Sequence, residues 1–330
     1  MSPRKGPNSP LADAVDLLPK TSSMSEREVA GSERNGTIEL LRVVSACGII
    51  WFHSEATPFR RIGFAGLVFF LIVSVLFQKR SAERSRGSVF FARRASRLLV
   101  PWAAWFVIYG LLNLGTGKPF FRYTSGFFAD LLCGPWIGLW FLPFSFVTAG
   151  LVYGLINSLR LPRLPIQFFT WAVLSLLTLG AVSWLRASSS PAAPWAQWLQ
   201  AAPSIPIGFA FACAAEDLAK SRTVLSLFQA SVLVACIPLY FLDPGIAICY
   251  GLGSALVTIG LVFKSRLSPP VGRLSALCLG VYLIHGAVMS AFKIVPWVTQ
   301  HYLPWFILTT LVSFIAIALL RRMPWAQSIC

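Results

Sequence analysis

The chain has 330 residues, of which 56% are hydrophobic and 12% are charged, and its net charge is +16. A soluble domain is nearer half apolar and a quarter charged, so the composition excludes an ordinary soluble fold. The basic excess does not indicate nucleic-acid binding, which needs a basic face on a soluble module. In a membrane protein, such an excess marks cytoplasmic loops.

The first 37 residues are polar, with many Pro and Ser residues and mixed charge. They lack the basic-then-apolar order of a cleaved signal peptide, and we expect a disordered cytoplasmic tail. The seven cysteines are scattered, mostly in apolar runs, and none forms a CxxC pair. We therefore expect neither disulfides nor a metal site.

Ten hydrophobic runs of membrane-spanning length follow this segment. A transmembrane helix needs roughly 17–25 mostly apolar residues. The sequence thus predicts an all-α, polytopic membrane protein, with a transmembrane domain at 38–320 and a short cytoplasmic tail at 321–330. The expected helices are 38–54, 62–78, 98–115, 136–157, 165–185, 203–219, 223–242, 245–263, 272–293 and 303–320.

Basic residues are unevenly distributed among the loops that join these helices. With the N-terminus in the cytoplasm, the inner loops carry sixteen Lys and Arg residues and the outer loops carry six. Because cytoplasmic loops hold the basic excess, we expect both termini inside, in a multi-pass protein of the cell's inner (plasma) membrane. Tryptophans near helix ends are expected to anchor the helices at the membrane interface. They are Trp102, Trp136, Trp297 and Trp305.

The first helix holds polar side chains that are costly to bury in lipid. Arg42 and His53 are 11 residues apart, almost three helical turns, so they share one face and lie about 16 Å apart along the axis. Glu39 precedes Arg42 by three residues, a spacing at which side chains pair. His53 in a polar pocket can act as a general base toward a hydroxyl. The alternative is that Arg42 and His53 extend to the headgroups at opposite membrane surfaces.

A second polar feature lies at the foot of the third helix, in KRSAERSRGSVFFARRASRLLVPW, residues 79–102. Arg97 follows Arg93 and Arg94 by four and three residues, so a helix places it on the same side as both. Guanidinium groups arranged in this way bind phosphates through forked, charge-assisted hydrogen bonds. The alternative is that the three arginines only signal topology and contact anionic lipids.

Five segments in this order resemble motifs of the acyltransferase 3 family of integral-membrane O-acyltransferases. Arg42 and His53 form an R-x10-H pattern within IELLRVVSACGIIWFHS. The resemblance covers about residues 38 to 320. The sequence departs from the family pattern at two positions: Glu39 stands where the family often has Asp or Lys, and Val75 stands where it often has Gly. The other four segments are GLVFFLIVS (66–74), FFARRASRLLVPW (90–102), LWFLPF (139–144) and LGVYLIHGAV (279–288).

The resemblance implies that an acyl group, usually acetyl, passes from acetyl-CoA at the cytoplasmic side to a hydroxyl of a carbohydrate. It implies no permanently bound cofactor. The acceptor would be a surface polysaccharide, a lipid-linked glycan or a related envelope component. The family's essential groups carry over to Arg42, His53, Arg94 and Arg97.

With their neighbours, these groups give three sets of expected site residues. The alternative for His285 is a hydrogen-bonded core histidine. The catalytic set is His53, Arg42 and Glu39, the acyl-CoA-binding set is Arg93, Arg94 and Arg97, and the substrate-binding set is Ser74, Trp140, Tyr282 and His285.

Two rival functions explain part of the same pattern. A transporter or flippase of lipid-linked sugars would also bury Arg, Glu and His, but it has no need of a phosphate-binding cluster at Arg94 and Arg97. A non-catalytic membrane scaffold would function normally after a His53→Ala substitution. The expected partners are acyl-CoA, a carbohydrate or glycolipid acceptor and membrane lipid, and nucleic acid is not among them.

Overall fold

Ten helices in the described part of the chain are long and apolar enough to cross a membrane. The computed structural model describes residues 34–54, 57–121, 126–158, 164–216 and 221–329, and these ranges contain no strand. The predicted all-α, multi-pass architecture is therefore confirmed. Most of the predicted N-terminal tail, residues 1–33, lies outside the described ranges.

Successive membrane-length helices run in opposite directions, and short helices join several of them. The end of the bundle at which the first helix, α2, begins is called the Arg42 end, and the end at which it finishes is called the His53 end. The long helices are α2 (Gly36–His53), α4 (Ala65–Arg84), α5 (Gly87–Gly115), α7 (Phe141–Ser158), α8 (Leu164–Ser188), α10 (Ser204–Glu216, which α9 extends), α11 (Ser221–Leu242), α12 (Pro244–Val262), α13 (Pro269–Phe292) and α15 (Tyr302–Leu320). The short helices are α3 (Arg60–Gly63), α6 (Phe127–Cys133), η1 (Ile137–Trp140), α9 (Trp195–Ala201), α14 (Pro296–Gln300) and η2 (Pro324–Ser328).

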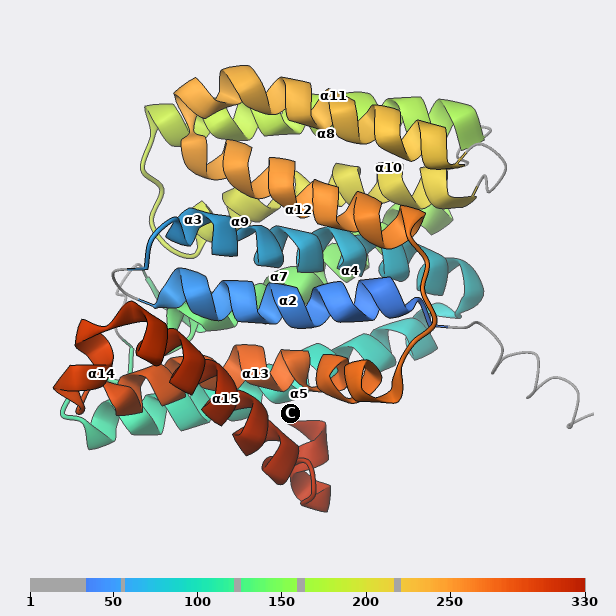
Figure 1. Cartoon of the computed structure of the whole chain (residues 1–330). Helices are drawn as coiled ribbons and strands as arrows, with labels where there is room; N and C mark the ends of the chain where they lie inside the picture. Colours follow the sequence, from blue (N-terminus) through green and yellow to red (C-terminus); the bar gives the residue numbers. More distant parts are fainter. Residues whose placement is uncertain (1–33, 55–56, 122–125, 159–163, 217–220, 330) are drawn as a thin grey trace, which may run out of the picture. The chain divides into compact units, whose positions relative to one another are not determined.

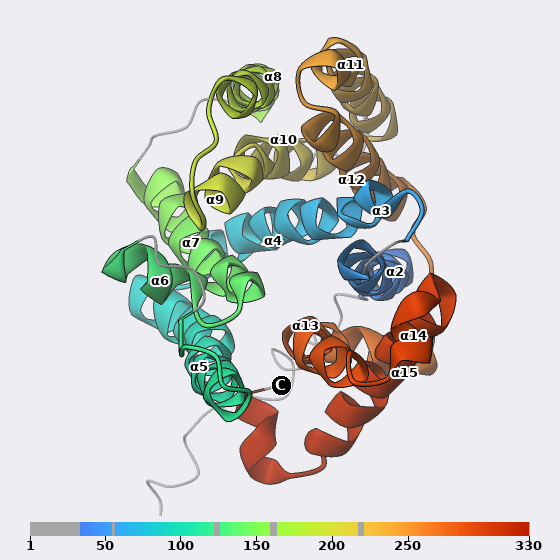
Figure 2. The same ribbon diagram turned by 90° about the vertical axis from the view of Figure 1, so that its left-hand side faces the viewer.

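Helix α2 occupies an inner position between other helices. It packs against α4 on one side and α13 on the other (Figure 1). Viewed from the His53 end of the bundle, α4, α2, α13, α5 and α7 follow one another around a ring (Figure 2). Glu39 of α2 is buried, Arg42 and His53 are partly buried, and the exposed positions of this helix are the apolar Leu40 and Val44.

Glycines allow α3 and α4 to approach α2 closely. A Cβ atom on Gly63 of α3 would lie 2.2 Å from the carbonyl oxygen of Gly48, and one on Gly66 of α4 would lie 2.4 Å from that of Ser45. Small residues at such contacts let helix backbones approach in a membrane. These two contacts also fix how far along α2 each residue of α4 lies.

The outer helices present apolar side chains away from the protein. Leu177 of α8, Ile237 of α11 and Leu311 of α15 are each more than half exposed. In a soluble protein this surface would be an aggregation hazard, whereas in a bilayer it contacts acyl chains.

The third membrane-length helix begins earlier than its hydropathy predicts. The expected start was residue 98, but α5 begins at Gly87. Phe90 is fully buried against Ala82 and Ala149, so packing continues the helix through a segment rich in basic residues. Arg93, Arg94 and Arg97 therefore lie within α5, in its first three turns.

The predicted C-terminal tail at 321–330 is partly structured. Residues Pro324–Ser328 form η2, and Trp105 of α5 donates a hydrogen bond from its indole nitrogen to the carbonyl oxygen of Ile329 at 3.0 Å. The segment thus returns to contact the bundle.

Candidate active site

Both ends of α2 are fixed by polar side chains. Asn35 caps the first turn by accepting a hydrogen bond from the Thr37 amide at 3.0 Å, as an Asn N-cap does. At the other end, Thr57 donates to the carbonyl oxygen of Ser54 at 2.8 Å, and Ser54 donates to that of Ile50 at 2.9 Å. The last residue of the helix, His53, is therefore held at a defined position.

Helices α2 and α13 run in the same direction and share polar contacts near both ends. At the Arg42 end, Arg42 forms an ion pair with Glu39 at 3.0 Å, and Ser275 of α13 donates a hydrogen bond to the same carboxylate oxygen. Glu39 is buried, and these contacts compensate its charge. The predicted Glu39–Arg42 pair is present, and it ties α2 to α13.

At the other end, His53 of α2 meets His285 of α13. The centroids of the two imidazole rings are 5.2 Å apart. The indole ring of Trp136 contacts both, with centroid distances of 6.3 Å to His53 and 5.1 Å to His285. The ring of Tyr282 lies 5.8 Å from His285. The structure thus brings His53 of the first motif together with Tyr282 and His285 of the last motif, and with Trp136.

The hydrogen bond of His285 leaves its second nitrogen available. Its Nδ1 lies 2.6 Å from the carbonyl oxygen of Tyr282. A carbonyl only accepts, so Nδ1 carries the proton, and in the neutral ring Nε2 has a free lone pair. His285 is fully buried, and Nε2 has no hydrogen-bond partner among the described residues. The burial and the bond to Tyr282 agree with the alternative of a hydrogen-bonded core histidine, and the substrate-binding role of His285 stays a prediction.

Two tyrosines hold the ring cluster in place. Tyr109 of α5 donates to the carbonyl oxygen of Leu283 at 2.7 Å and accepts from the Ala287 amide at 3.1 Å. It also stacks on Trp136, with a centroid distance of 4.9 Å. Tyr282 donates to the carbonyl oxygen of Gly138 at 2.5 Å. The hydroxyl proton of Tyr282 is therefore already used in a structural bond.

Trp136 is the member of this cluster that the sequence did not assign to it. Its place near a helix end predicts an interfacial anchor, but the ring packs inside, against His53 and His285. The sequence features that match this inward position are two glycines, Gly138 and Gly286. A Cβ on Gly138 would lie 2.2 Å from the Trp136 ring, and one on Gly286 would lie 2.6 Å from it. These two glycines leave the space that the indole fills.

The three predicted acyl-CoA-binding arginines lie on α5 at the Arg42 end. Arg93 and Arg97 are exposed, and Arg94 is partly buried, with its guanidinium carbon 5.3 Å from the centre of the Phe90 ring. This cation–π contact orients Arg94. The cluster and the histidine pair therefore lie toward opposite ends of the bundle.

Comparison with known protein families gives a match over residues 35–322, to the acyltransferase domain of the acyltransferase 3 family. The chain belongs to this family. No curated protein and no solved structure matches the sequence. The predicted membership is confirmed over nearly the whole chain, so this is a multi-pass membrane protein of an acyltransferase family.

Two of the predicted substrate-binding residues have no ring contact or hydrogen bond with the histidine pair among the described residues. Trp140 is buried, and its ring contacts are with Phe141 and Phe144. Ser74 accepts a hydrogen bond from Gln78 at 3.0 Å. The glycine contacts between α2 and α4 place Ser74 level with the first turn of α2, about 24 Å from His53 at 1.5 Å per residue.

An ion-pair cluster at the Arg42 end links α4 to α10. The ammonium group of Lys79 is almost completely buried and contacts Glu216 at 2.5 Å and Glu83 at 2.6 Å. Glu216 is the last residue of α10, and its carboxylate pairs with Lys79. The pair removes Lys79 from the set of side chains free to bind phosphate.

Substitution of Glu216 with glutamine is expected to destabilise the protein by about 1.5–3 kcal/mol, the net value of a hydrogen bond to a charged group. Lys79 would keep a single carboxylate partner while remaining buried. The measurement is unfolding of the purified protein in detergent. Glu83→Gln is the matched control, because Glu83 contacts the same ammonium but is more exposed. A loss no larger for Glu216→Gln than for Glu83→Gln would contradict this account.

Proposed function

We propose that the protein is an O-acyltransferase that moves an acyl group, most simply acetyl, from acyl-CoA to a hydroxyl of a cell-envelope or exported carbohydrate. The observation that carries the proposal is the pair of imidazole rings, 5.2 Å apart, in a chain of the acyltransferase 3 family. The buried Nε2 of His285 has no partner among the described residues. Family membership supports acyl transfer, and the ring pair supplies a base.

The donor is proposed to bind at the Arg42 end. Acyl-CoA carries several phosphate charges, and Arg93, Arg94 and Arg97 offer guanidinium groups on one stretch of α5. Each hydrogen bond to a charged group is worth roughly 1.5–3 kcal/mol. Arg42 lies at the same end of the bundle. It is positioned by Glu39 and is proposed to hold the pantetheine arm or to polarise the thioester carbonyl.

The acceptor is proposed to react at the His53 end. His53 takes the proton from the acceptor hydroxyl, and that oxygen attacks the thioester carbon. The tetrahedral intermediate collapses, the carbon–sulfur bond breaks, and the CoA thiolate recovers the proton from the imidazolium of His53. General-base assistance of this kind gives about 10²–10⁴ in rate. The Nε2 lone pair of His285 is proposed to accept a hydrogen bond from a neighbouring hydroxyl of the same sugar, which orients the ring.

The loop charges support one orientation in the membrane. The helices alternate in direction, and the basic excess favours the Arg42 end as cytoplasmic. The donor would then be cytoplasmic acyl-CoA, and the acceptor would lie toward the outer face of the plasma membrane. Arg42 and His53 lie about 16 Å apart along α2, and the flexible pantetheine arm of the donor is proposed to extend over this distance.

Substituting Arg94 and Arg97 with glutamine, singly, is expected to raise the KM for acyl-CoA by about 10–100-fold, because each variant loses a charged hydrogen bond worth roughly 1.5–3 kcal/mol. Initial rates over a range of acyl-CoA concentrations give the constant. Arg222→Gln is the control, since Arg222 is exposed at the same end of the bundle on α11. An unchanged KM in both α5 variants would remove this cluster from donor binding.

The proposed function is tested with membranes that contain the protein and acetyl-CoA labelled in its acetyl group. Glycans and glycolipids are extracted, and the label released by mild base is counted, because esters are base-labile. The proposal predicts ester-linked label above that of membranes lacking the protein. Absence of label, together with protein-dependent uptake of a lipid-linked sugar, would favour the transporter instead.

A further inference from the structure

Two hollows at the His53 end share one arginine. The larger has a volume of about 590 Å³ and lies between α3 and the neighbouring faces of α11 and α12. The smaller has a volume of about 370 Å³ and lies beside Phe52, the residue next to His53. Arg61 of α3 lines both hollows. The two hollows therefore lie on either side of one cationic side chain.

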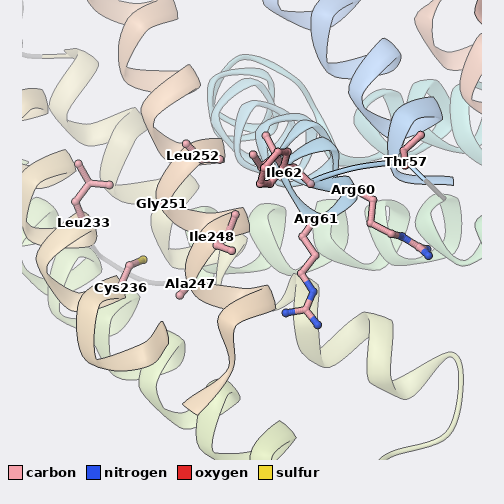
Figure 3. Close-up of a pocket in the computed structure, with 11 residues that line it drawn as sticks. Thr57, Arg60, Arg61, Ile62, Leu233, Cys236, Ala247, Ile248, Gly251 and Leu252 are labelled. Carbon is pink, nitrogen blue, oxygen red and sulfur yellow. The ribbon is translucent and has the colours of Figure 1, made fainter. Parts of the chain in front are cut away.

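The two hollows differ in chemistry. The larger is lined on its α11 and α12 sides by apolar residues (Figure 3), and Leu233 and Leu252 among them are at least 40% exposed. These positions lie on a membrane-facing surface, so lipid chains have direct access to the hollow. The smaller has a mixed lining, in which Phe52 and Phe64 face polar groups that include Gln200 and the ion pair between Arg186 and Asp243 at 2.8 Å.

Arg61 is the cation available to a ligand at the junction. Its side chain extends downward from α3, on the side of Ala247 and Ile248, whereas that of Arg60 extends to the right, away from α12 (Figure 3). Arg60 lies over the Phe52 ring at 5.1 Å, and Arg186 is paired with Asp243. Arg61 is exposed and forms no ion pair with any residue of the described ranges. A cation beside an apolar, lipid-accessible surface is complementary to the phosphate of an amphiphile.

We infer that this site binds the acceptor as a glycolipid whose headgroup is joined to its hydrocarbon through phosphate. The hydrocarbon lies along α11 and α12 in the larger hollow, and the phosphate binds Arg61. The sugar enters the smaller hollow beside Phe52, whose ring centroid lies 5.1 Å from that of His53. This inference rests on the proposed function, because it names the class of acceptor for that reaction.

Hydrocarbon packing alone would not select such a lipid. A chain that leaves the bilayer for the groove exchanges one apolar environment for another, so little hydrophobic free energy is gained. The phosphate contact with Arg61 must therefore carry the discrimination, through a charge-assisted hydrogen bond. We therefore expect a lipid that carries a phosphate to bind, and we expect neither the hydrocarbon part alone nor the phosphate part alone to bind.

The test is equilibrium binding to the purified full chain in nonionic detergent, with no acyl donor present. Three probes divide the ligand. Phosphatidic acid carries chain and phosphate, diacylglycerol carries the chains alone, and glycerol phosphate carries the phosphate alone. The structure predicts saturable binding of phosphatidic acid only, weakened about tenfold or more in Arg61→Gln through the lost charged contact. Lys118→Gln, which removes an exposed cation at the same end, should bind as the wild type does.

A second variant addresses the groove itself. Leu252→Trp fills the larger hollow from an exposed position and should also weaken phosphatidic acid binding, while Arg61 is kept. Equal binding of phosphatidic acid to wild type, Arg61→Gln and Leu252→Trp would overturn the inference. Equal binding of diacylglycerol would mean nonspecific lipid contact, and equal binding of glycerol phosphate would mean a site for free phosphates. Each of these results overturns it.

Separate experiments distinguish a failure of the proposed lipid site from a failure of the proposed acyl transfer. His53→Gln should bind phosphatidic acid as tightly as wild type, because His53 does not line either hollow. Normal lipid binding without ester formation would overturn the proposed function. Ester formation that is unchanged in Arg61→Gln and Leu252→Trp would overturn the acceptor site alone.

Discussion

Replacement of His53 with glutamine is expected to lower the rate of acyl transfer by about 10²–10⁴-fold, the usual contribution of a general base. Glutamine keeps a polar side chain at the end of α2 but cannot take up the hydroxyl proton. His53 is only partly buried, and no hydrogen bond to its ring is formed by the described residues, so the helix should fold normally. Initial rates in membranes with matched protein levels measure the effect.

His301→Gln is the matched control for this substitution. His301 lies at the same end of the bundle, is exposed, and has its Nδ1 2.9 Å from the carbonyl oxygen of Trp297. It contacts neither His53 nor His285. A rate in His53→Gln within twofold of that in His301→Gln would show that His53 is not the general base. The base would then be His285, or neither histidine would act as one.

A second large effect is expected from Gly286→Ala, which adds one methyl group behind Trp136. The new Cβ would lie 2.6 Å from the indole ring and 2.9 Å from the hydroxyl oxygen of Tyr109. The ring must move, and its neighbours are His53 and His285. Overpacking of this kind costs about 1–3 kcal/mol in stability, and a displacement of about 1 Å in a reacting group can cost about 10²-fold in rate. We therefore expect a roughly 100-fold loss of transfer, with the protein still folded.

Gly180→Ala provides the control for this effect. Gly180 also lies within a long helix, but a Cβ there has no atom within 4 Å, and alanine is the better helix former. Its activity and thermal stability should equal or exceed those of wild type. If Gly286→Ala were as active as Gly180→Ala, the position of Trp136 would have no bearing on the reaction.

Hydropathy predicted the ten membrane-length helices because lipid imposes a minimum length on each apolar run. It could not predict the first turns of α5, where helix formation depends on Phe90 packing against Ala82 and Ala149. Local spacing predicted the ion pair between Glu39 and Arg42, since three residues bring two side chains together on one helix. Its tie to Ser275 joins residues far apart in the sequence, and no spacing rule reveals it.

The sequence predicted some residues of the candidate site and missed others. The motif order placed His53, Tyr282 and His285 among the site residues, and the fold brings these three together. Trp136 was missed because interfacial tryptophans are common at helix ends, and only the packing shows that its ring turns inward. The pairing of Lys79 with Glu216 joins α4 to α10. The sequence could not predict this pair, because counting the charges in loops treats each residue separately.

The central claim is that the donor binds at one end of the bundle and the acceptor hydroxyl reacts at the other. It is tested in sealed vesicles containing the protein, with labelled acetyl-CoA added outside only, so that only molecules with the donor site outward react. A membrane-impermeant esterase is then added outside, before and after permeabilisation. The account predicts ester label that resists the esterase until the vesicles are opened. Release of the label from intact vesicles would contradict it, because donor and acceptor would then meet on the same face.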